Sequence, residues 1–364
     1  MTHKINAKSA YGKIGLVLIL LFISLLSLRF GSAEMTNAEF FGGLFNRQGF
    51  ESENIILLSL RFGSAEMTDA EFFGGLFNRQ GYETEGIILL TLRLPRILAA
   101  ILAGAGLSVS GVILQSVTGN ELASPNIIGV NAGAGFFVIL MLFFAPQTVY
   151  LRPFAAFAGA FLTTLFILFA ASKGHFSKTT LILCGVAITA VLNAGISFLT
   201  YLNPDVLMDY NFFSVGGVAG AEINELILPT LAVAFCVTVA LVFSKKIDIM
   251  CLGDSLANSL GVNVKLLRVA CLAVAGLSAA SAVSFAGLLG FVGLVVPHIA
   301  RKITDGSVSE MLKVSVITGG ILVVTADLIG RTLFAPSEIP VGVVMAFVGA
   351  PFLLYIVIRR GKNA

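Results

Sequence analysis

Asp327 and Arg331 are the residues whose types and spacing most suggest chemistry within an apolar stretch of the sequence. A carboxylate is costly inside a membrane-length apolar segment, so a functional role is the first hypothesis for Asp327. Arg331 follows four residues later, which places both side chains on one face of a helix. The spacing favours a local ion pair near the end of that segment, with a functional role as the alternative.

The other reactive side chains form no recognisable catalytic set. The histidines are far apart in the sequence and show no metal-ligand spacing with Glu or Cys: His3, His175 and His298. Neither a G-x-S-x-G elbow nor a Walker A loop is present. The cysteines lack a C-x-x-C pair and are expected to be free, buried thiols: Cys184, Cys236, Cys251 and Cys271. We therefore expect no catalysis, no ATP hydrolysis by this chain, and no bound metal or cofactor.

The polar segment 245–264 separates two apolar stretches and carries helix-boundary signals. Asp254 is a residue type that caps helix N-termini, and Gly261 is one that ends helices. We expect two short helices, broken by Gly253 and Gly261, that form a compact knob at the inner face of a membrane. The knob is interpreted as a docking site for a cytoplasmic partner, and a mere connector is the alternative. Its candidate residues are Leu252, Gly253, Asp254, Ala257, Leu260 and Gly261.

The composition defines the surroundings in which these residues must work. Of the 364 residues, 57% are hydrophobic and 12% are charged, and the mean hydropathy is +0.96. Soluble domains carry about a quarter charged residues, so this chain could not cover its surface with polar groups in water. We expect an all-α, polytopic membrane protein that forms a single domain over residues 1–364. A net charge of +3 does not suggest a nucleic-acid partner.

Ten apolar windows approach the length of about 20 residues with which a helix crosses a bilayer. The predicted spans are residues 14–29, 96–116, 125–145, 152–172, 179–202, 225–244, 265–285, 286–300, 312–330 and 341–358. The eighth span is short and begins with glycine. A further short apolar piece, residues 211–220, is predicted to be re-entrant or interfacial.

The lysines determine the predicted orientation. With ten spans, all 11 lysines fall on the side of the two termini, and the opposite side keeps only arginines. Since cytoplasmic loops are enriched in positive charge, both termini are predicted to be cytoplasmic, with the protein in the cell membrane. The first span also resembles a signal peptide with a cleavage site at Gly31-Ser32-Ala33, and this alternative would remove a span that the lysine pattern requires.

The predicted outer loop, residues 30–92, contains a tandem duplication. A segment that starts at Leu26 recurs from Leu58 with an offset of 32 residues. Two copies are too few for a solenoid, and exposed loops tolerate long insertions. Each copy carries Phe and Leu at helical spacing and is expected to form a short amphipathic helix on the membrane. A solvated insertion is the favoured interpretation, with contact to an outside partner as the alternative.

Small residues are concentrated in two predicted spans, around Gly104 to Gly111 and Gly129 to Gly135. Such residues let two helices approach closely in lipid. They would also form a wide, smooth channel wall, and the sequence leaves both interpretations open.

Several motifs in a fixed order resemble the FecCD-type permeases, the membrane subunits of importers for iron–siderophores, haem and cobalamin. The resemblance runs from about residue 90 to the C-terminus. The motifs are Arg93-Leu94-Pro95-Arg96 with Gln115, Leu122-Ala123-Ser124-Pro125 with Gly129, Leu252-Gly253-Asp254 through Leu260-Gly261-Val262, Gly290-Phe291-Val292-Gly293 through Pro297-His298-Ile299-Ala300-Arg301, Ala326-Asp327 with Arg331, Glu338-Ile339-Pro340-Val341-Gly342, and Gly349-Ala350-Pro351-Phe352. In the usual family pattern a proline stands where this chain has Glu121, which leaves the geometry of that turn in question.

The resemblance implies a type II ABC importer permease of about ten helices. It implies two cytoplasmic ABC ATPases docked on the knob, a substrate-binding protein outside, and a second permease copy that completes the path. The arginines that match the family's docking positions for the binding protein are Arg93, Arg96 and Arg331, and arginine suits carboxylate recognition. A structural or gating role is implied for Gly290, Gly293, Pro297, His298, Arg301 and Asp327.

The expected function is therefore a permease that moves a metal chelate into the cytoplasm by alternating access. A ferric siderophore is the expected cargo, with cobalamin or haem as the alternatives. The rival class is an ion-coupled secondary transporter, which would need ionisable residues near mid-membrane and often broken helices. The sequence shows no carboxylate in a span away from its end, so this rival and a membrane enzyme are both disfavoured.

Overall fold

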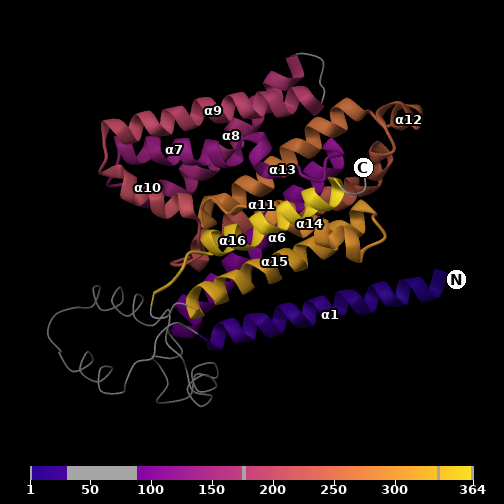
Figure 1. Cartoon of the computed structure of the whole chain (residues 1–364), viewed down its shortest axis with the longest axis horizontal. Helices are drawn as coiled ribbons and strands as arrows, with labels where there is room; N and C mark the ends of the chain where they lie inside the picture. Colours follow the sequence, from indigo (N-terminus) through magenta and orange to yellow (C-terminus); the bar gives the residue numbers. More distant parts are fainter. Residues whose placement is uncertain (1, 31–87, 174–177, 334–336, 362–364) are drawn as a thin grey trace.

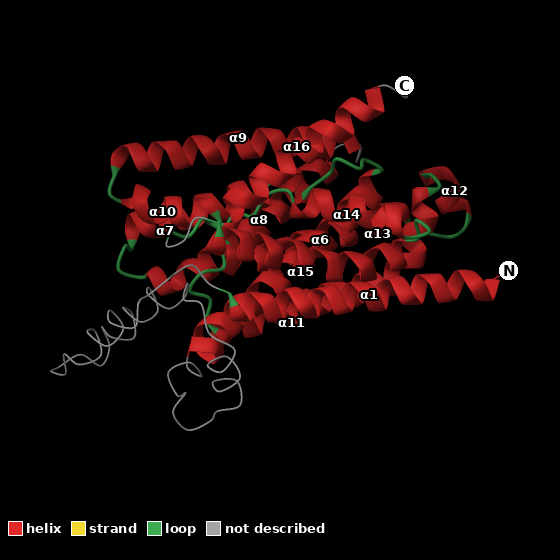
Figure 2. Ribbon diagram, turned by 60° about the horizontal axis from the view of Figure 1, so that its bottom comes forward, coloured by secondary structure: helices red, strands yellow, loops and turns green. Residues whose placement is uncertain are grey.

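The computed structural model is a bundle of long helices that run roughly along one common direction, as Figures 1 and 2 show. It describes residues 2–30, 88–173, 178–333 and 337–361, and these residues contain helices and connections but no strand. The duplicated outer loop and its expected amphipathic helices lie outside the described residues. The predicted all-α membrane fold is confirmed.

Each of the ten predicted spans corresponds to a helix. These helices are α1 (Thr2–Arg29), α6 (Leu94–Thr118), α7 (Val130–Phe144), α8 (Arg152–Lys173), α9 (Lys178–Leu202), α11 (Ile223–Cys251), α13 (Val264–Ala286), α14 (Val292–Ile303), α15 (Val308–Thr332) and α16 (Val341–Gly361). Seven segments of the described chain are long and apolar enough to cross a membrane, while α7 and α14 have only 15 and 12 residues. The count of ten spans is therefore approximate.

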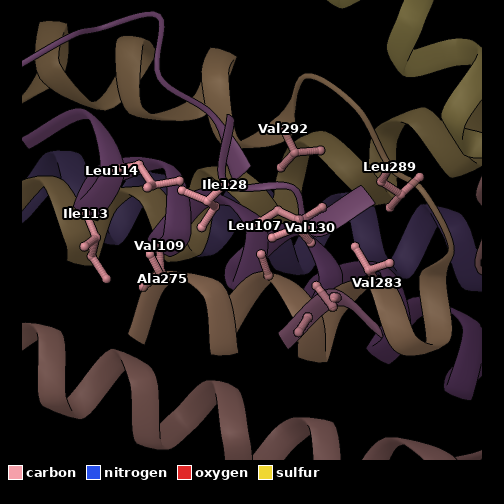
Figure 3. Packing of buried hydrophobic residues seen from close by; sticks show 14 of the residues in the cluster. Leu107, Val109, Ile113, Leu114, Ile128, Val130, Ala275, Val283, Leu289 and Val292 are labelled. Atoms are coloured by element: carbon pink, nitrogen blue, oxygen red, sulfur yellow. The ribbon is translucent and has the colours of Figure 1, made fainter. Parts of the chain in front are cut away.

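Helix α6 lies at the centre of the bundle and packs against α11, α13, α14 and α15. A π-helical turn, η1 (Ile88–Arg93), leads into it. Its buried residues are mostly small or aliphatic, and Figure 3 shows Leu107, Val109 and Leu114 among neighbours from other helices. Helices α7, α8 and α9 form a second group joined to this centre mainly through α13.

The glycines of α6 allow two helix backbones to touch it directly. A Cβ atom added at Gly104 would lie 2.1 Å from the carbonyl oxygen of Gly319 in α15. One added at Gly111 would lie 1.9 Å from the carbonyl oxygen of Gly293 in α14. Both separations are far inside van der Waals contact, so only glycine fits at these positions. At these two positions, the small residues act in close helix packing rather than as a smooth channel wall.

The short apolar piece at 211–220 comprises the end of α10 (Val206–Val215) and an irregular linker to α11. This linker is tied to two neighbouring helices by backbone hydrogen bonds. Gly217 N donates to Ala286 O at 2.9 Å, and Gly342 N donates to Gly216 O at 3.1 Å. The end of α13, the start of α16 and the linker are therefore joined at one end of the bundle.

The predicted knob contains one short helix rather than two. Residues 245–251 continue α11, because Ile247 and Met250 are buried at helical spacing, and only α12 (Asp254–Ser259) stands apart. Gly253 occupies the N-cap position with φ 117°, so the prediction that Asp254 caps the helix is wrong. The prediction that a glycine ends it is confirmed, since Gly261 follows α12 with φ 80°. In Figure 1, both chain termini lie at the same end of the bundle as α12.

The cysteines are free thiols, as predicted, but they are not all buried. Cys236 and Cys271 are buried, Cys184 is half-buried, and Cys251 at the end of α11 is exposed. The expected burial is wrong for Cys251, because it sits where α11 leaves the bundle to form the knob.

Candidate functional site

A network of buried charges joins α6 and α15 at the end of the bundle opposite α12. Nε of Arg96 donates to both carboxylate oxygens of Asp327, at 2.9 and 3.1 Å, and its Nη2 lies 2.8 Å from Oδ1. Arg331 forms an ion pair with the same carboxylate at 3.2 Å. The predicted local pair of Asp327 and Arg331 is therefore present, but Arg96, distant in sequence, is the closer partner.

The same network reaches α1 and the connection that precedes α16. Nη1 of Arg96 donates to Oε2 of Glu338 at 2.9 Å. Arg331 donates to the backbone carbonyl of Ser27 at 2.9 Å and to its hydroxyl oxygen. Nη1 of Arg93 donates to the carbonyls of Leu28 at 2.5 Å and Arg29 at 2.9 Å. The three arginines thus join the ends of α1, α6 and α15.

The structure brings the three predicted docking arginines together, but it does not place them on an exposed surface. Arg93 and Arg331 are each 1% exposed, and Arg96 is 9% exposed. Their guanidinium groups already bind carboxylates and backbone carbonyls of this chain. Glu338 is the most accessible member of the network, with 29% of its side chain exposed. Because Arg96 and Glu338 are 242 residues apart, sequence spacing gave no sign of this contact.

A cavity of about 440 Å³ with both polar and apolar walls opens beside the network. Arg96 and Glu338 form part of its wall, and Arg152 and Glu225 contribute further charges. The irregular linker after α10 and the end of α13 complete the lining. This end of the bundle therefore presents a charged vestibule above a largely apolar interior.

The knob at the other end is attached to α13 by an ion pair. Nη2 of Arg268, in the first turns of α13, donates to Oδ1 of Asp254 at 2.7 Å. Ala257 is fully buried, and Val262 N donates to its carbonyl at 3.0 Å. By contrast, Leu252 and Leu260 are 65% and 58% exposed. The knob is therefore linked to α13 by one ion pair and presents leucine side chains outward.

Helix α13 connects these two regions. It begins at the knob, with Arg268 bound to Asp254, and ends at Ala286 in the lining of the charged vestibule. Its middle is closely packed, since a Cβ atom at Gly276 would lie 2.4 Å from the Thr164 side chain. Helix α13 therefore spans the distance between the knob and the vestibule.

The motif from Gly290 to Arg301 forms the entry and the whole of α14 up to its last turn. Gly293 lies against α6, where an added Cβ would be 2.8 Å from Leu107 O, and Pro297 is buried within the helix. Gly290 has nothing within 4 Å of such an atom. The ring of His298 meets the ring of Phe352 edge-on, with centroids 5.7 Å apart. Most of this motif thus supports helix packing.

Arg301 gives the unusual Glu121 a partner. Nη1 of Arg301 donates to Oε1 of Glu121 at 2.9 Å. The turn that carries Glu121 follows Gly119, which caps α6 with φ 61°. The Glu121 carboxylate therefore links the turn after α6 to the end of α14. Across the part of the chain that is described, no three His, Cys, Asp or Glu side chains are grouped to hold a metal ion.

Comparisons with known proteins agree on one family. The model of the FecCD transport family matches residues 53–359. The chain is 38% identical to the Fe(3+)-citrate import system permease protein YfmE of Bacillus subtilis, over 72% of this chain and 79% of that protein. It is 32% identical to the hemin transport system permease protein HmuU of Yersinia pestis and 36% identical to the cobalamin import system permease protein BtuC of Halobacterium salinarum. These matches cover 74% of this chain each, and 83% and 73% of those proteins.

The fold also matches a solved structure over nearly its whole length. That structure is described as an inward-facing conformation of a metal-chelate type ABC transporter. The TM-score is 0.77 at 26% identity, and the match covers 96% of this chain and 99% of the other.

Proposed function

The chain belongs to the FecCD transport family, and from that premise we propose that it is the permease of an ABC importer whose cargo is a ferric siderophore. The main support for an iron chelate is that relatives at 38% identity carry the names of Fe(3+)-citrate and iron(3+)-hydroxamate permeases. Haem and cobalamin are the alternative cargoes, because similar relatives carry those names too. The chain itself is a multi-pass membrane protein with a transport role, and ATP hydrolysis belongs to a separate subunit.

We propose that the complete importer contains two ATPases, a substrate-binding protein and a second copy of this chain. Support for the second copy comes from α9, which is apolar but exposes Asn193 and Ser197. Lipid cannot satisfy such groups, whereas a facing helix or a water-filled path can. The knob is the proposed ATPase site, and its exposed Leu252 and Leu260 fit a hydrophobic pocket of a partner. In this orientation the termini are cytoplasmic and the membrane is the cell membrane.

For the binding protein, the proposed docking end is the one where Arg93, Arg96 and Arg331 gather. Arginines at an interface favour acidic side chains of a partner. Since Asp327 and Glu338 already engage Arg96, a partner carboxylate must compete with them. Glu338 is the more accessible of these two carboxylates. We therefore propose that a carboxylate of the binding protein replaces Glu338 in its contact with Arg96.

Alternating access is the proposed mechanism. ATP-driven motion of the partner displaces α12, the ion pair of Asp254 and Arg268 carries the displacement into α13, and α13 moves the rim of the vestibule. An ion-coupled mechanism has less support, because the buried carboxylate Asp327 is already paired with two arginines. Such a carboxylate is a poor site for a transported cation.

Uptake measurements in whole cells test the proposed cargo. We expect cells that carry this chain with its ATPase and binding protein to accumulate radioactive iron supplied as a ferric hydroxamate or ferric citrate. Cells that lack only this chain should not. Accumulation of haem or cobalamin with no iron-chelate uptake would assign the alternative cargo and overturn the siderophore proposal.

We expect Arg268→Gln to uncouple ATP hydrolysis from uptake. The variant keeps the size of the side chain but loses its ion pair with Asp254, so α12 is no longer held to α13 by a charge. Uptake should fall about ten-fold while the ATPase continues to turn over, which corresponds to about 1.4 kcal/mol of lost coupling. The measurement is the ratio of transported substrate to hydrolysed ATP in proteoliposomes.

Lys265→Gln is the matched control. It removes a charge from the same helix one turn earlier, where the side chain is exposed. This control should transport normally. Equal coupling ratios for the two variants would refute the role of the Asp254–Arg268 pair.

A further inference from the structure

A groove lies between α8 and α11, and its floor is α13. Both helices pack on α13, but they barely touch each other. The space between them measures about 510 Å³ and is lined mainly by apolar side chains. The walls that matter here are Phe154 and Phe157 of α8 and Leu228, Pro229 and Ala232 of α11.

The groove opens toward the lipid rather than toward another helix of the described chain. The neighbouring outward-facing residues of α8 and α11 are large and apolar. Phe154 is 61% exposed on α8, and Leu228 and Phe235 are 64% and 58% exposed on α11. A surface of this kind on a membrane helix faces acyl chains. An acyl chain of the surrounding bilayer therefore has direct access to the groove.

The mouth of the groove is polar and carries both signs of charge. Asn224, Glu225 and the exposed ring of Tyr150 lie at this end. Arg152 lines the adjoining vestibule, which shares Glu225, Pro153 and Ser284 with the groove. Tyrosine at this depth is typical of the membrane–water interface. The mouth thus lies at the level of lipid headgroups.

The two charged side chains at the mouth, Arg152 and Glu225, do not form an ion pair with each other. The described residues offer Arg152 no ion pair within 4.0 Å, although it is a charged neighbour of Glu225. Pro229 has no N–H for the carbonyl of Glu225, which frees a second acceptor at the mouth. A cation, a carboxylate and a free carbonyl side by side complement a ligand that carries a phosphate and an ammonium group.

We propose that this groove binds one phospholipid with a zwitterionic aminoethyl headgroup, phosphatidylethanolamine, from the leaflet at the vestibule end. One acyl chain lies between α8 and α11 on the floor of α13. The phosphate is bound by Arg152, and the ammonium group donates to Glu225. The lipid then holds α8 and α11 apart beside α13, the helix that connects the knob to the vestibule.

Lipid retention tests the site directly. The full chain is reconstituted in vesicles that contain phosphatidylethanolamine, phosphatidylcholine and phosphatidylglycerol, and is then extracted in mild detergent. Native mass spectrometry measures the mass of the extracted protein and identifies the lipids that remain bound. We expect one retained phosphatidylethanolamine per chain. Arg152→Gln should reduce retention about ten-fold, because a hydrogen bond between two charged groups is lost. Glu225→Gln should remove the preference for phosphatidylethanolamine over phosphatidylcholine.

Two variants on α11 separate occupancy of the groove from general lipid contact. Ala232→Phe fills the groove and should abolish retention. Ala234→Phe adds the same ring to an exposed position outside the groove and should retain the lipid. Equal retention by these two variants, or a preference for phosphatidylglycerol in the unmodified chain, would overturn the proposal. Arg152→Gln provides an independent test should Ala232→Phe fail to fold.

Discussion

Asp327→Ala is expected to destabilise the folded chain by about 3–5 kcal/mol, because the change leaves buried guanidinium groups without their counter-charge. The Asp327 side chain is 1% exposed and pairs with both Arg96 and Arg331. Arg331 is itself 1% exposed, so water cannot take over the lost interaction. Loss on this scale is a large fraction of the total stability of a typical domain. Thermal unfolding of the purified protein in detergent, followed by its circular dichroism, measures the effect.

Glu338→Gln is the matched control within the same network. Glu338 has a single described partner, Arg96, and a partly exposed side chain, so we expect it to contribute only about 1 kcal/mol or less. Asp327→Asn should resemble Asp327→Ala, since it also removes the charge. If Asp327→Ala and Glu338→Gln unfold at the same temperature, the buried network does not hold these helices together.

Removing the arginines together with the carboxylate provides a further check. A triple variant, Asp327→Leu with Arg96→Met and Arg331→Leu, removes the buried carboxylate together with both of its guanidinium partners and leaves Glu338, which is partly exposed, to water. Replacing a buried ion triad by apolar residues is often neutral. We expect this variant to be more stable than Asp327→Ala alone, and the opposite order would contradict the electrostatic explanation.

Helix positions were predictable because membrane crossing imposes a length and a polarity on each segment. α8 and α9 begin and end within two residues of their predicted limits, and charged residues stand at both ends of α8 and at the start of α9. Residues 125–145 were predicted as one span, but Gly129 adopts φ 72° and separates a short 3-10 turn from α7. Hydropathy alone could not reveal that break.

The predicted start of the knob was wrong, because the end of α11 follows from the pattern of its buried residues and not from the polarity of the sequence. The segment from Lys245 reads as polar, which suggested that the helix ended there. Ser244, Ile247 and Met250 continue the buried face of α11 at spacings of three residues, and this face extends the helix to Cys251. That periodicity was visible in the sequence and could have corrected the prediction.

The charged contacts separate what spacing can predict from what it cannot. The pairing of Asp327 with Arg331 follows from their four-residue interval on a helix. The pairing of Arg96 with Asp327 spans 231 positions and depends on how α6 packs against α15. Likewise, Glu121 departs from the usual family pattern, and its partner Arg301 is 180 positions away in the sequence. Such contacts follow from packing, which is why spacing in the sequence predicted the local partner of Asp327 but not its distant one.

Gly111→Ala is expected to force α6 and α14 apart and to destabilise the chain by about 3 kcal/mol, at the upper end of typical overpacking costs. The new Cβ would lie 1.9 Å from the Gly293 carbonyl oxygen and 2.7 Å from its carbonyl carbon. Both obstructing atoms belong to the backbone, so no side chain can rotate to make room. One of the two helices must move, and α14 carries the motif from Gly293 to Arg301 with it. Thermal unfolding and transport should both be impaired.

Gly290→Ala is the control that isolates this backbone contact. Gly290 precedes the same helix α14, but nothing lies within 4 Å of a Cβ atom added there, and its φ is not positive. The control should therefore unfold within about 0.5 kcal/mol of the unmodified chain, as substitutions outside packed regions usually do. Because the two variants add the same methyl group, a difference between them measures the cost of separating α6 from α14. Equal stability would mean that the helices can slide apart freely, and the close contact between their backbones could not be what sets their spacing.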